Sequence, residues 1–188
     1  EPRQVGDEYC WVVDPLDGTT NYVHGCPCYA VSIAIVRAGK PVAGVVYDPN
    51  GEELFAAESG SGAFLNGTSI RASNVSTLGD ALVAVSFPPV VERDADVVKV
   101  FLAVLERAQA MRRTGSAALN LAFVASGRYD AYWSTTTKPW DIAAGALLVE
   151  EAGGVLTGFD GAPFDVWDPR FVAAGTAALH EELRRYVG

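Results

Sequence analysis

Two aspartates three residues apart are the feature of this sequence with the clearest chemistry. They belong to the segment Asp-Pro-Leu-Asp-Gly-Thr-Thr-Asn at residues 14–21, directly after the apolar run 10–13. Carboxylates suit Mg²⁺, which usually also keeps waters and phosphate oxygens in its shell. Gly18 allows close backbone approach, and the N–H groups of Gly18 and Thr19 would bind an anion if a short helix begins there. The segment therefore predicts a magnesium and phosphate site, although an Asp-rich turn has a similar composition.

A single aspartate, Asp141, is the second candidate for cation or substrate binding. It lies in Lys-Pro-Trp-Asp-Ile-Ala-Ala-Gly at residues 138–145, where an apolar helix is expected to begin. Taken alone, a capping aspartate beside a core tryptophan is the simpler explanation, because the helix dipole favours a negative charge there. Two carboxylates about 4 Å apart repel by about 4 kcal/mol at an effective dielectric near 20. If Asp141 lies close to Asp14 and Asp17, the three carboxylates therefore require divalent cations.

The elements that must position these carboxylates change from strands to helices along the chain. Short apolar runs bounded by turn residues fill most of the first half, which is typical of hairpins in an antiparallel sheet. Later segments are apolar at helical spacing or on all sides, and Ser116 is the natural N-cap of one of them. The predicted strands span residues 10–13, 29–37, 42–47, 54–57, 63–65, 82–87, 129–133, 155–157 and 172–174. The predicted helices span residues 94–107, 116–126, 141–152 and 178–187. This order predicts a layered α/β fold.

Composition narrows the class of protein further. The 188 residues are 49% hydrophobic and 20% charged, which suits one globular domain, and the net charge of −9 disfavours nucleic acid as a partner. No apolar run is long enough to span a membrane, and residues 1–4 do not begin a signal peptide. An odd number of cysteines, three, argues against a disulfide-stapled secreted domain. These features predict a cytoplasmic protein with no membrane or nucleic-acid partner.

Together the two aspartate segments resemble the signatures of the inositol monophosphatase family, and the similarity runs from Trp11 to the carboxyl terminus. The other matching segments are Gly-Ser-Ala-Ala at 115–118, Gly-Arg-Tyr-Asp at 127–130 and Glu-Ala-Gly-Gly at 151–154. The resemblance implies a Mg²⁺-dependent phosphoric monoester hydrolase acting on a small sugar or polyol phosphate. It also implies a layered α-β-α-β-α sugar-phosphatase fold in a single domain over residues 1–188, two or three Mg²⁺ ions per site, and a homodimer.

The resemblance further implies roles for individual residues. Asp14 would bridge two metal ions, and the Leu16 carbonyl would serve the first site. Asp17 and Asp141 would complete the second site. The catalytic residues would be Asp17 and Thr19, whose hydroxyl would orient the attacking water. The substrate-binding residues would be Gly18, Thr19, Ser116, Ala117, Ser134 and Asp141.

One departure from the family concerns the amino terminus. The family has a Gly-Glu-Glu segment upstream of the first motif, and one of its glutamates ligates metal. Only 13 residues precede Asp14, and neither Glu1 nor Glu8 is a credible substitute. We therefore expect an amino-terminally incomplete domain that lacks the family's opening helices. The alternative is a catalytically impaired fragment or pseudo-enzyme that scaffolds or dimerises.

The second departure is Ser134, which stands where inositol-type members carry a glutamate that contacts substrate hydroxyls. This difference weakens myo-inositol monophosphate as the substrate and leaves phosphatase chemistry untouched. Histidinol phosphate, fructose bisphosphate and phosphoadenosine phosphate remain alternative substrates, although the acidity of the chain makes a large polyanion less attractive.

Overall fold

A computed structural model describes residues 8–88, 90–93, 95–168 and 170–188. The expectations for residues 1–4, and for position 94 as the start of a helix, lie outside the described residues. Within those ranges no helix is both long enough and apolar enough to cross a bilayer.

The first sheet is an antiparallel meander of six strands in chain order, and its first five strands are the hairpin series that the sequence predicts, whereas the sixth was not predicted. Side chains alternate between its two faces, as in β2, where every second residue is buried. Its strands are β1 (Tyr9–Asp17), β2 (Ala30–Arg37), β3 (Lys40–Asp48), β4 (Glu53–Glu58), β5 (Gly62–Leu65) and β6 (Thr68–Ser69).

The second sheet has five strands in the order β10-β11-β9-β7-β8, with β7 parallel to both of its neighbours. Its strands are β7 (Leu82–Ser86), β8 (Ala110–Arg112), β9 (Ala131–Ser134), β10 (Val155–Thr157) and β11 (Phe171–Ala174). The strand β8 was not predicted, because a three-residue Ala-Met-Arg run is too short to show periodicity. It pairs with β7 only after the helix α2 (Asp96–Leu105) has returned the chain to the edge of the sheet.

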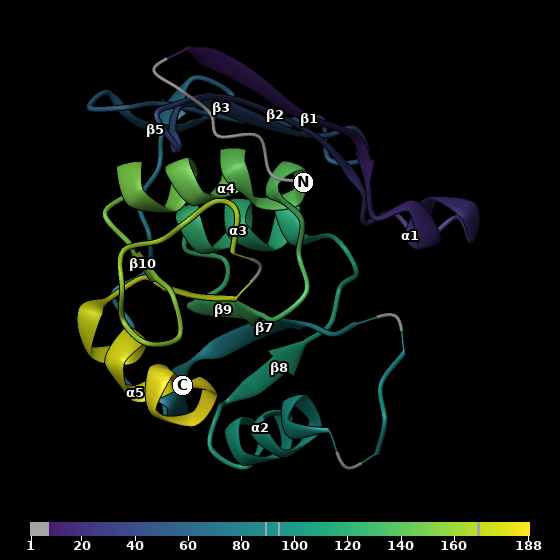
Figure 1. Cartoon of the computed structure of the whole chain (residues 1–188), viewed down its shortest axis with the longest axis vertical. Coiled ribbons are helices and arrows are strands. Elements are labelled where there is room, and N and C mark those ends of the chain that lie inside the picture. The colour runs from purple at the N-terminus through teal and green to yellow at the C-terminus, as the bar shows by residue number, and fades with distance from the viewer. Residues whose placement is uncertain (1–7, 89, 94, 169) are drawn as a thin grey trace.

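Helices separate and cover the two sheets (Figure 1). The helices α3 (Ala117–Ala125) and α4 (Pro139–Glu151) lie between the sheets. Every residue of α3 except Phe123 is buried, and so are residues 142–149 of α4. A methyl group on Gly145 of α4 would lie 2.5 Å from Cβ of Leu121, so glycine allows these two helices to approach closely. The helices α2 and α5 (Ala177–Val187) pack on the far face of the second sheet. The described residues thus form layers in the order β-α-β-α, which confirms the predicted layered α/β fold.

The outer face of the first sheet is apolar and open to solvent. Trp11 is 67% exposed and Val13 is 47% exposed, whereas Val12 between them is buried against the inner helices. Tyr9, Tyr47 and Leu54 are also large and exposed, and strand register places Ile35 opposite Trp11. Contiguous apolar surface of this kind usually marks an association surface.

We expect the purified 188-residue chain to self-associate through this face. Each large apolar side chain removed from water contributes about 1.5–3 kcal/mol, so the double variant Trp11→Gln, Leu54→Gln should weaken association at least about tenfold. Sedimentation velocity over a concentration series measures the effect. Val90→Gln is the control, because Val90 is 82% exposed but lies outside the sheet. Equal association of all three proteins would contradict the expectation.

Candidate active site

A β-bulge brings the first two aspartates to the same side of β1. Asp14 pairs with Ser32 and Asp17 pairs with Ala30, so three steps along β1 match two steps along β2. In a regular strand, side chains three residues apart point to opposite faces, and one extra residue reverses this. Pro15 suits the bulge because it has no N–H for the ladder. The prediction that the strand ends at residue 13 was therefore too short, since β1 continues through the bulge.

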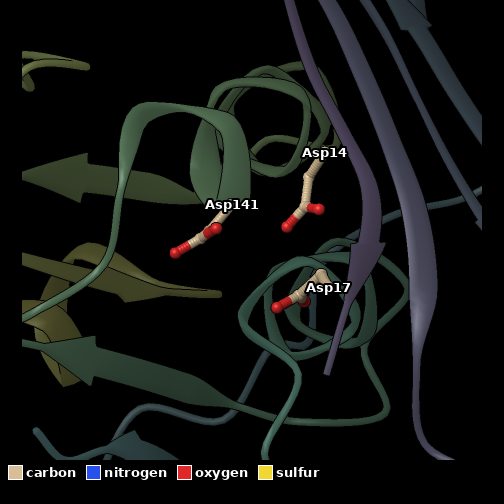
Figure 2. A group of neighbouring side chains, drawn as sticks. All are labelled: Asp14, Asp17 and Asp141. Atoms are coloured by element: carbon tan, nitrogen blue, oxygen red, sulfur yellow. The ribbon is translucent and has the colours of Figure 1, made fainter. Parts of the chain in front are cut away.

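The third aspartate comes from the start of α4. Asp141 lies in the first turn of this helix, and one carboxylate oxygen accepts a hydrogen bond from the Lys138 backbone N–H at 2.8 Å. The capping role expected from the helix start is thus present. It uses one oxygen, and the carboxylate also faces Asp14 and Asp17 (Figure 2).

The three carboxylates converge on one point. One oxygen from each of Asp14, Asp17 and Asp141 can be chosen so that all three lie within 4.8 Å of one another. Figure 2 shows the side chains entering a common space from β1 and from the start of α4. Such close acidic groups repel unless a cation lies among them or protons neutralise them.

Asp17 is the most enclosed of the three, with 9% of the residue exposed. Its Oδ2 accepts hydrogen bonds from the Ser116 hydroxyl at 2.6 Å and from the Ala118 backbone N–H at 2.8 Å. Burial raises the pKa of Asp17 to about 6 against these two stabilising contacts, and the nearby charge of Asp14 adds to the rise. The carboxylate is therefore fixed in direction by α3 and poorly solvated.

Asp141 has a still higher pKa. Burial raises it to about 7, and the negative charges of Asp17 and Asp14 act in the same direction, while the Lys138 backbone N–H opposes the shift. Without a cation, Asp17 and Asp141 are therefore partly protonated near neutral pH, where ordinary aspartates are fully ionised.

The raised pKa values predict how pH affects the stability of the metal-free protein. Between the ordinary aspartate pKa of 3.8 and about 7, the folded protein holds a proton on Asp141 that the unfolded chain has released. The free energy of unfolding therefore falls as pH rises through this window. Asp141→Asn removes the titrating group, so its Tm should match wild type near pH 4 and exceed it at pH 8.

After allowance for solvent screening, the gain at pH 8 should be about 1 kcal/mol, or about 2–4 °C. Thermal unfolding of both proteins in chelator, at several pH values, measures it. A Tm difference that is constant from pH 4 to pH 8 would show that the titration of Asp141 does not affect the stability of the metal-free protein.

Gly18 connects β1 to the five-residue helix α1 (Thr19–Val23). Its φ of 85° is in the left-handed region, and a Cβ there would lie 2.8 Å from the Cys28 carbonyl oxygen. Thr19 donates its hydroxyl hydrogen to the Leu16 carbonyl at 3.0 Å. Leu16, Gly18 and Thr19 thus lie in the bulge and turn that carry Asp14 and Asp17, and the roles that the resemblance implies for them stay predictions.

A cavity of about 520 Å³ opens at the aspartates. Its volume is within the range of small-molecule sites in proteins. The lining residues are Asp17, Thr20, Asn21, Ser86, Phe87, Arg113, Thr114, Gly115, Ala117, Thr136, Thr137 and Asp141.

The remaining predicted site residues lie at different depths around this cavity. Ala117 lines it. Ser116 is fully buried, where it caps α3 as predicted and donates to Asp17. Ser134 is also fully buried, and its hydroxyl accepts a hydrogen bond from the Thr136 backbone N–H at 3.4 Å. The cavity wall here consists of Thr136 and Thr137, and Ser134 does not line it.

Sequence reasoning gave no role to several residues that shape the site. Asn21 donates from Nδ2 to the Cys28 carbonyl at 2.6 Å and to the Thr114 carbonyl at 2.8 Å, which joins the first motif to the loop before α3. Arg113 and Phe87 line the cavity although neither belongs to an aspartate motif. Asn21 could have been noticed, because it ends the first motif, but nothing local to Arg113 or Phe87 indicates their position.

Comparison with other proteins shows the family and supports the fold. The profile of the inositol monophosphatase family matches residues 2–188. An inositol-1-monophosphatase of Mesorhizobium japonicum is 43% identical over 181 residues, covering 96% of this chain and 68% of the relative. A Nus factor SuhB of Pseudomonas aeruginosa is 45% identical over 159 residues, covering 83% of this chain and 59% of that protein. The structure of an inositol monophosphatase from Anabaena (Nostoc) superimposes with a TM-score of 0.91 at 40% identity, covering 98% of this chain and 73% of that one.

The fold, the site and these similarities define the class of protein. The chain belongs to the inositol monophosphatase family, a family of phosphatases. It spans between 59% and 73% of the length of the three relatives named above.

Proposed function

We propose that this protein is a Mg²⁺-dependent phosphomonoesterase that hydrolyses a small sugar or polyol phosphate with a metal-activated water. The observation that carries the proposal is the convergence of Asp14, Asp17 and Asp141 beside a cavity of small-molecule size, in a chain of this family. Hydrolysis breaks the bond between phosphorus and the alcohol oxygen, and the products are inorganic phosphate and the free alcohol.

The donor set fits magnesium rather than a softer metal. All of the proposed ligand atoms are oxygens, from three carboxylates and the Leu16 carbonyl, and hard cations prefer such ligands. In this proposal the carboxylates of Asp14, Asp17 and Asp141 and the Leu16 carbonyl would hold two or three ions, with Asp14 and Leu16 at the first site and Asp14, Asp17 and Asp141 at the second. Bound Mg²⁺ supplies a water of lowered pKa and neutralises charge on the phosphate oxygens.

The chain's own residues hold the phosphate and the water. The backbone N–H groups of Gly18 and Thr19 bind phosphate oxygens, and the Thr19 hydroxyl orients the attacking water. Ser116 and the Ala118 N–H act through Asp17, because they fix its carboxylate. No covalent phosphoenzyme is assigned to Asp14 or Asp17, since both serve as ligands.

The substrate is proposed to be a phosphate monoester other than myo-inositol 1-phosphate. A serine at position 134 has no carboxylate for a polyol hydroxyl. Its full burial, with Thr136 and Thr137 in the cavity lining instead of Ser134, supports the same proposal. A hydrogen bond to a charged group contributes about 1.5–3 kcal/mol, so its loss lowers discrimination for inositol by about tenfold or more.

A panel of monoesters tests the function and the substrate proposal together. The protein, produced at the full length of its gene, should release phosphate with Mg²⁺ from several small monoesters, and at least one should exceed myo-inositol 1-phosphate in kcat/KM. A tenfold preference for inositol phosphate over the panel would refute the argument from Ser134. No hydrolysis of any member, by protein that binds Mn²⁺ normally, would favour the non-catalytic scaffolding alternative.

We also propose that the protein works in the cytoplasm as a homodimer. The free state of all three cysteines suits a reducing compartment. Sedimentation equilibrium of the protein produced at the full length of its gene tests the dimer. The role expected for an upstream glutamate stays a prediction, which a comparison of Mn²⁺ affinity between the 188-residue chain and the protein produced at the full length of its gene would test.

A further inference from the structure

One cationic side chain stands among the described residues that line the cavity. It is Arg113, in the loop between β8 and α3, and the other charged residues of the lining are Asp17 and Asp141. Among the described residues, Arg113 forms no ion pair, either with Asp17 or Asp141 or with a carboxylate at the surface. An unpaired guanidinium in a cleft is a ready partner for an anionic ligand group.

The guanidinium of Arg113 lies over the aromatic ring of Phe87. Its Cζ lies 5.1 Å from the ring centroid of Phe87. Phe87 is itself held edge-on by Phe101 at 5.3 Å and by Trp133 at 6.4 Å between centroids, and Trp133 is fully buried. Stacking on a ring uses the flat face of a guanidinium and leaves the N–H donors at its edge available.

The backbone beside Arg113 is fixed as well. The Thr114 carbonyl accepts a hydrogen bond from Asn21 at 2.8 Å, and the Thr114 hydroxyl donates to Oδ1 of Asn120 at 2.6 Å. Asn120 is fully buried in α3. The loop that carries Arg113 is therefore tied to the first aspartate motif on one side and to a core helix on the other, so the backbone from which the cation extends is fixed beside the site.

The size of the cavity leaves room for a ligand with two separated charges. A volume of about 520 Å³ exceeds the space that one phosphate group needs. The aspartate cluster with its cations accounts for the phosphate that is cleaved. That reaction gives Arg113 no role, because a neutral polyol leaving group has no negative charge for the guanidinium to bind. The net charge of −9 does not oppose this reading, since binding depends on the local charge in the cavity.

We propose that Arg113, stacked on Phe87, is a specificity-determining residue that binds a second anionic group of the substrate, distal to the phosphate that is cleaved. This inference rests on the proposed phosphatase function and narrows its substrate class to phosphate monoesters that carry a further phosphate or carboxylate. Bidentate hydrogen bonds from a guanidinium suit both groups.

Two matched substrate pairs test the proposal. Fructose 1,6-bisphosphate and fructose 1-phosphate differ by one phosphate, whereas 3-phosphoglycerate and glycerol 1-phosphate differ by one carboxylate. In wild type, kcat/KM should be higher for the member that carries the second anionic group in at least one pair, and the pair that responds identifies the group. Arg113→Gln should lower the ratio within that pair by about 10- to 100-fold, chiefly through KM, because a charge-assisted contact is lost.

Two further variants separate binding from general effects of charge. Arg113→Lys keeps the charge but loses the fork, and it should restore part of the ratio. Arg112→Gln removes an adjacent exposed arginine that does not line the cavity, and it should leave the ratio within twofold.

The outcomes are distinguishable from failure of the proposed function. A ratio unchanged in Arg113→Gln, or an equal fall for both members of each pair, overturns the role of Arg113 while phosphatase activity stands. The same effect from Arg112→Gln also overturns it, because the effect is then one of overall charge. Absence of hydrolysis for all four compounds in wild type overturns the proposed function itself.

Discussion

Asp141→Asn is expected to lower kcat by about 100-fold or more, a rise of at least 2.7 kcal/mol in the barrier, without loss of the fold. The substitution removes one carboxylate from the cluster of three and with it a proposed cation ligand. An asparagine Oδ1 can still accept the hydrogen bond from the Lys138 N–H that holds the start of α4. The variant therefore isolates ligation from helix capping.

Steady-state kinetics with saturating Mg²⁺, together with circular dichroism, measure this effect. Asp96→Asn is the matched control, because Asp96 is also an acidic residue in the first turn of a helix but is exposed, and its helix α2 lies on the opposite side of the second sheet from α4 (Figure 1). It should leave kcat unchanged. An Asp141→Asn protein that keeps more than about a tenth of the wild-type kcat, a change under about 1.4 kcal/mol, would contradict direct ligation.

The combination of lost activity and gained metal-free stability is specific to this assignment. A carboxylate whose pKa is raised by burial and by neighbouring charges destabilises the folded protein at neutral pH unless a cation compensates. A residue kept only to cap α4 would show neither effect, because asparagine can still accept the hydrogen bond from the Lys138 N–H. The two measurements on one variant therefore separate function from structure.

Much of the layered fold could be predicted from local patterns. Hairpins in the first half and buried helices near 116–126 and 141–152 are encoded by turn residues and by runs that are apolar on all sides. The structure places the helices at Ala117–Ala125 and Pro139–Glu151. Short elements such as β8 were missed because three residues carry no period, and their pairing depends on the chain returning from α2.

The site was predictable where its chemistry is local and unpredictable where it depends on packing. Asp14 and Asp17 belong to one segment, yet the bulge that turns both to the same face leaves no mark beyond Pro15. The contact between Arg113 and Phe87 joins residues that are 26 positions apart, in the loops that follow β8 and β7, so no local motif could reveal it. Comparison of motifs predicts Ser134 as a substrate contact, whereas its full burial and its absence from the cavity lining depend on how β9 packs in the folded protein.

Removal of divalent cations is the second large effect that we expect. Three carboxylates with oxygens within 4.8 Å of one another, two of them with pKa values raised to about 6 and about 7, leave no suitable place for a phosphate dianion without added positive charge. In the absence of Mg²⁺, the repulsion between these groups and the substrate both weakens binding and raises the barrier. Turnover should fall to background.

The most direct test of the account is therefore phosphate release by metal-free protein. Protein produced at the full length of its gene is treated with chelator, verified as metal-free by elemental analysis, and assayed on glycerol 1-phosphate before and after Mg²⁺ is restored. We expect no release above background without the cation and full recovery with it, whereas an Asp14→Asn protein should recover little. Full turnover by protein that is verified as metal-free would contradict the assignment of the three aspartates as cation ligands in a metal-dependent phosphatase.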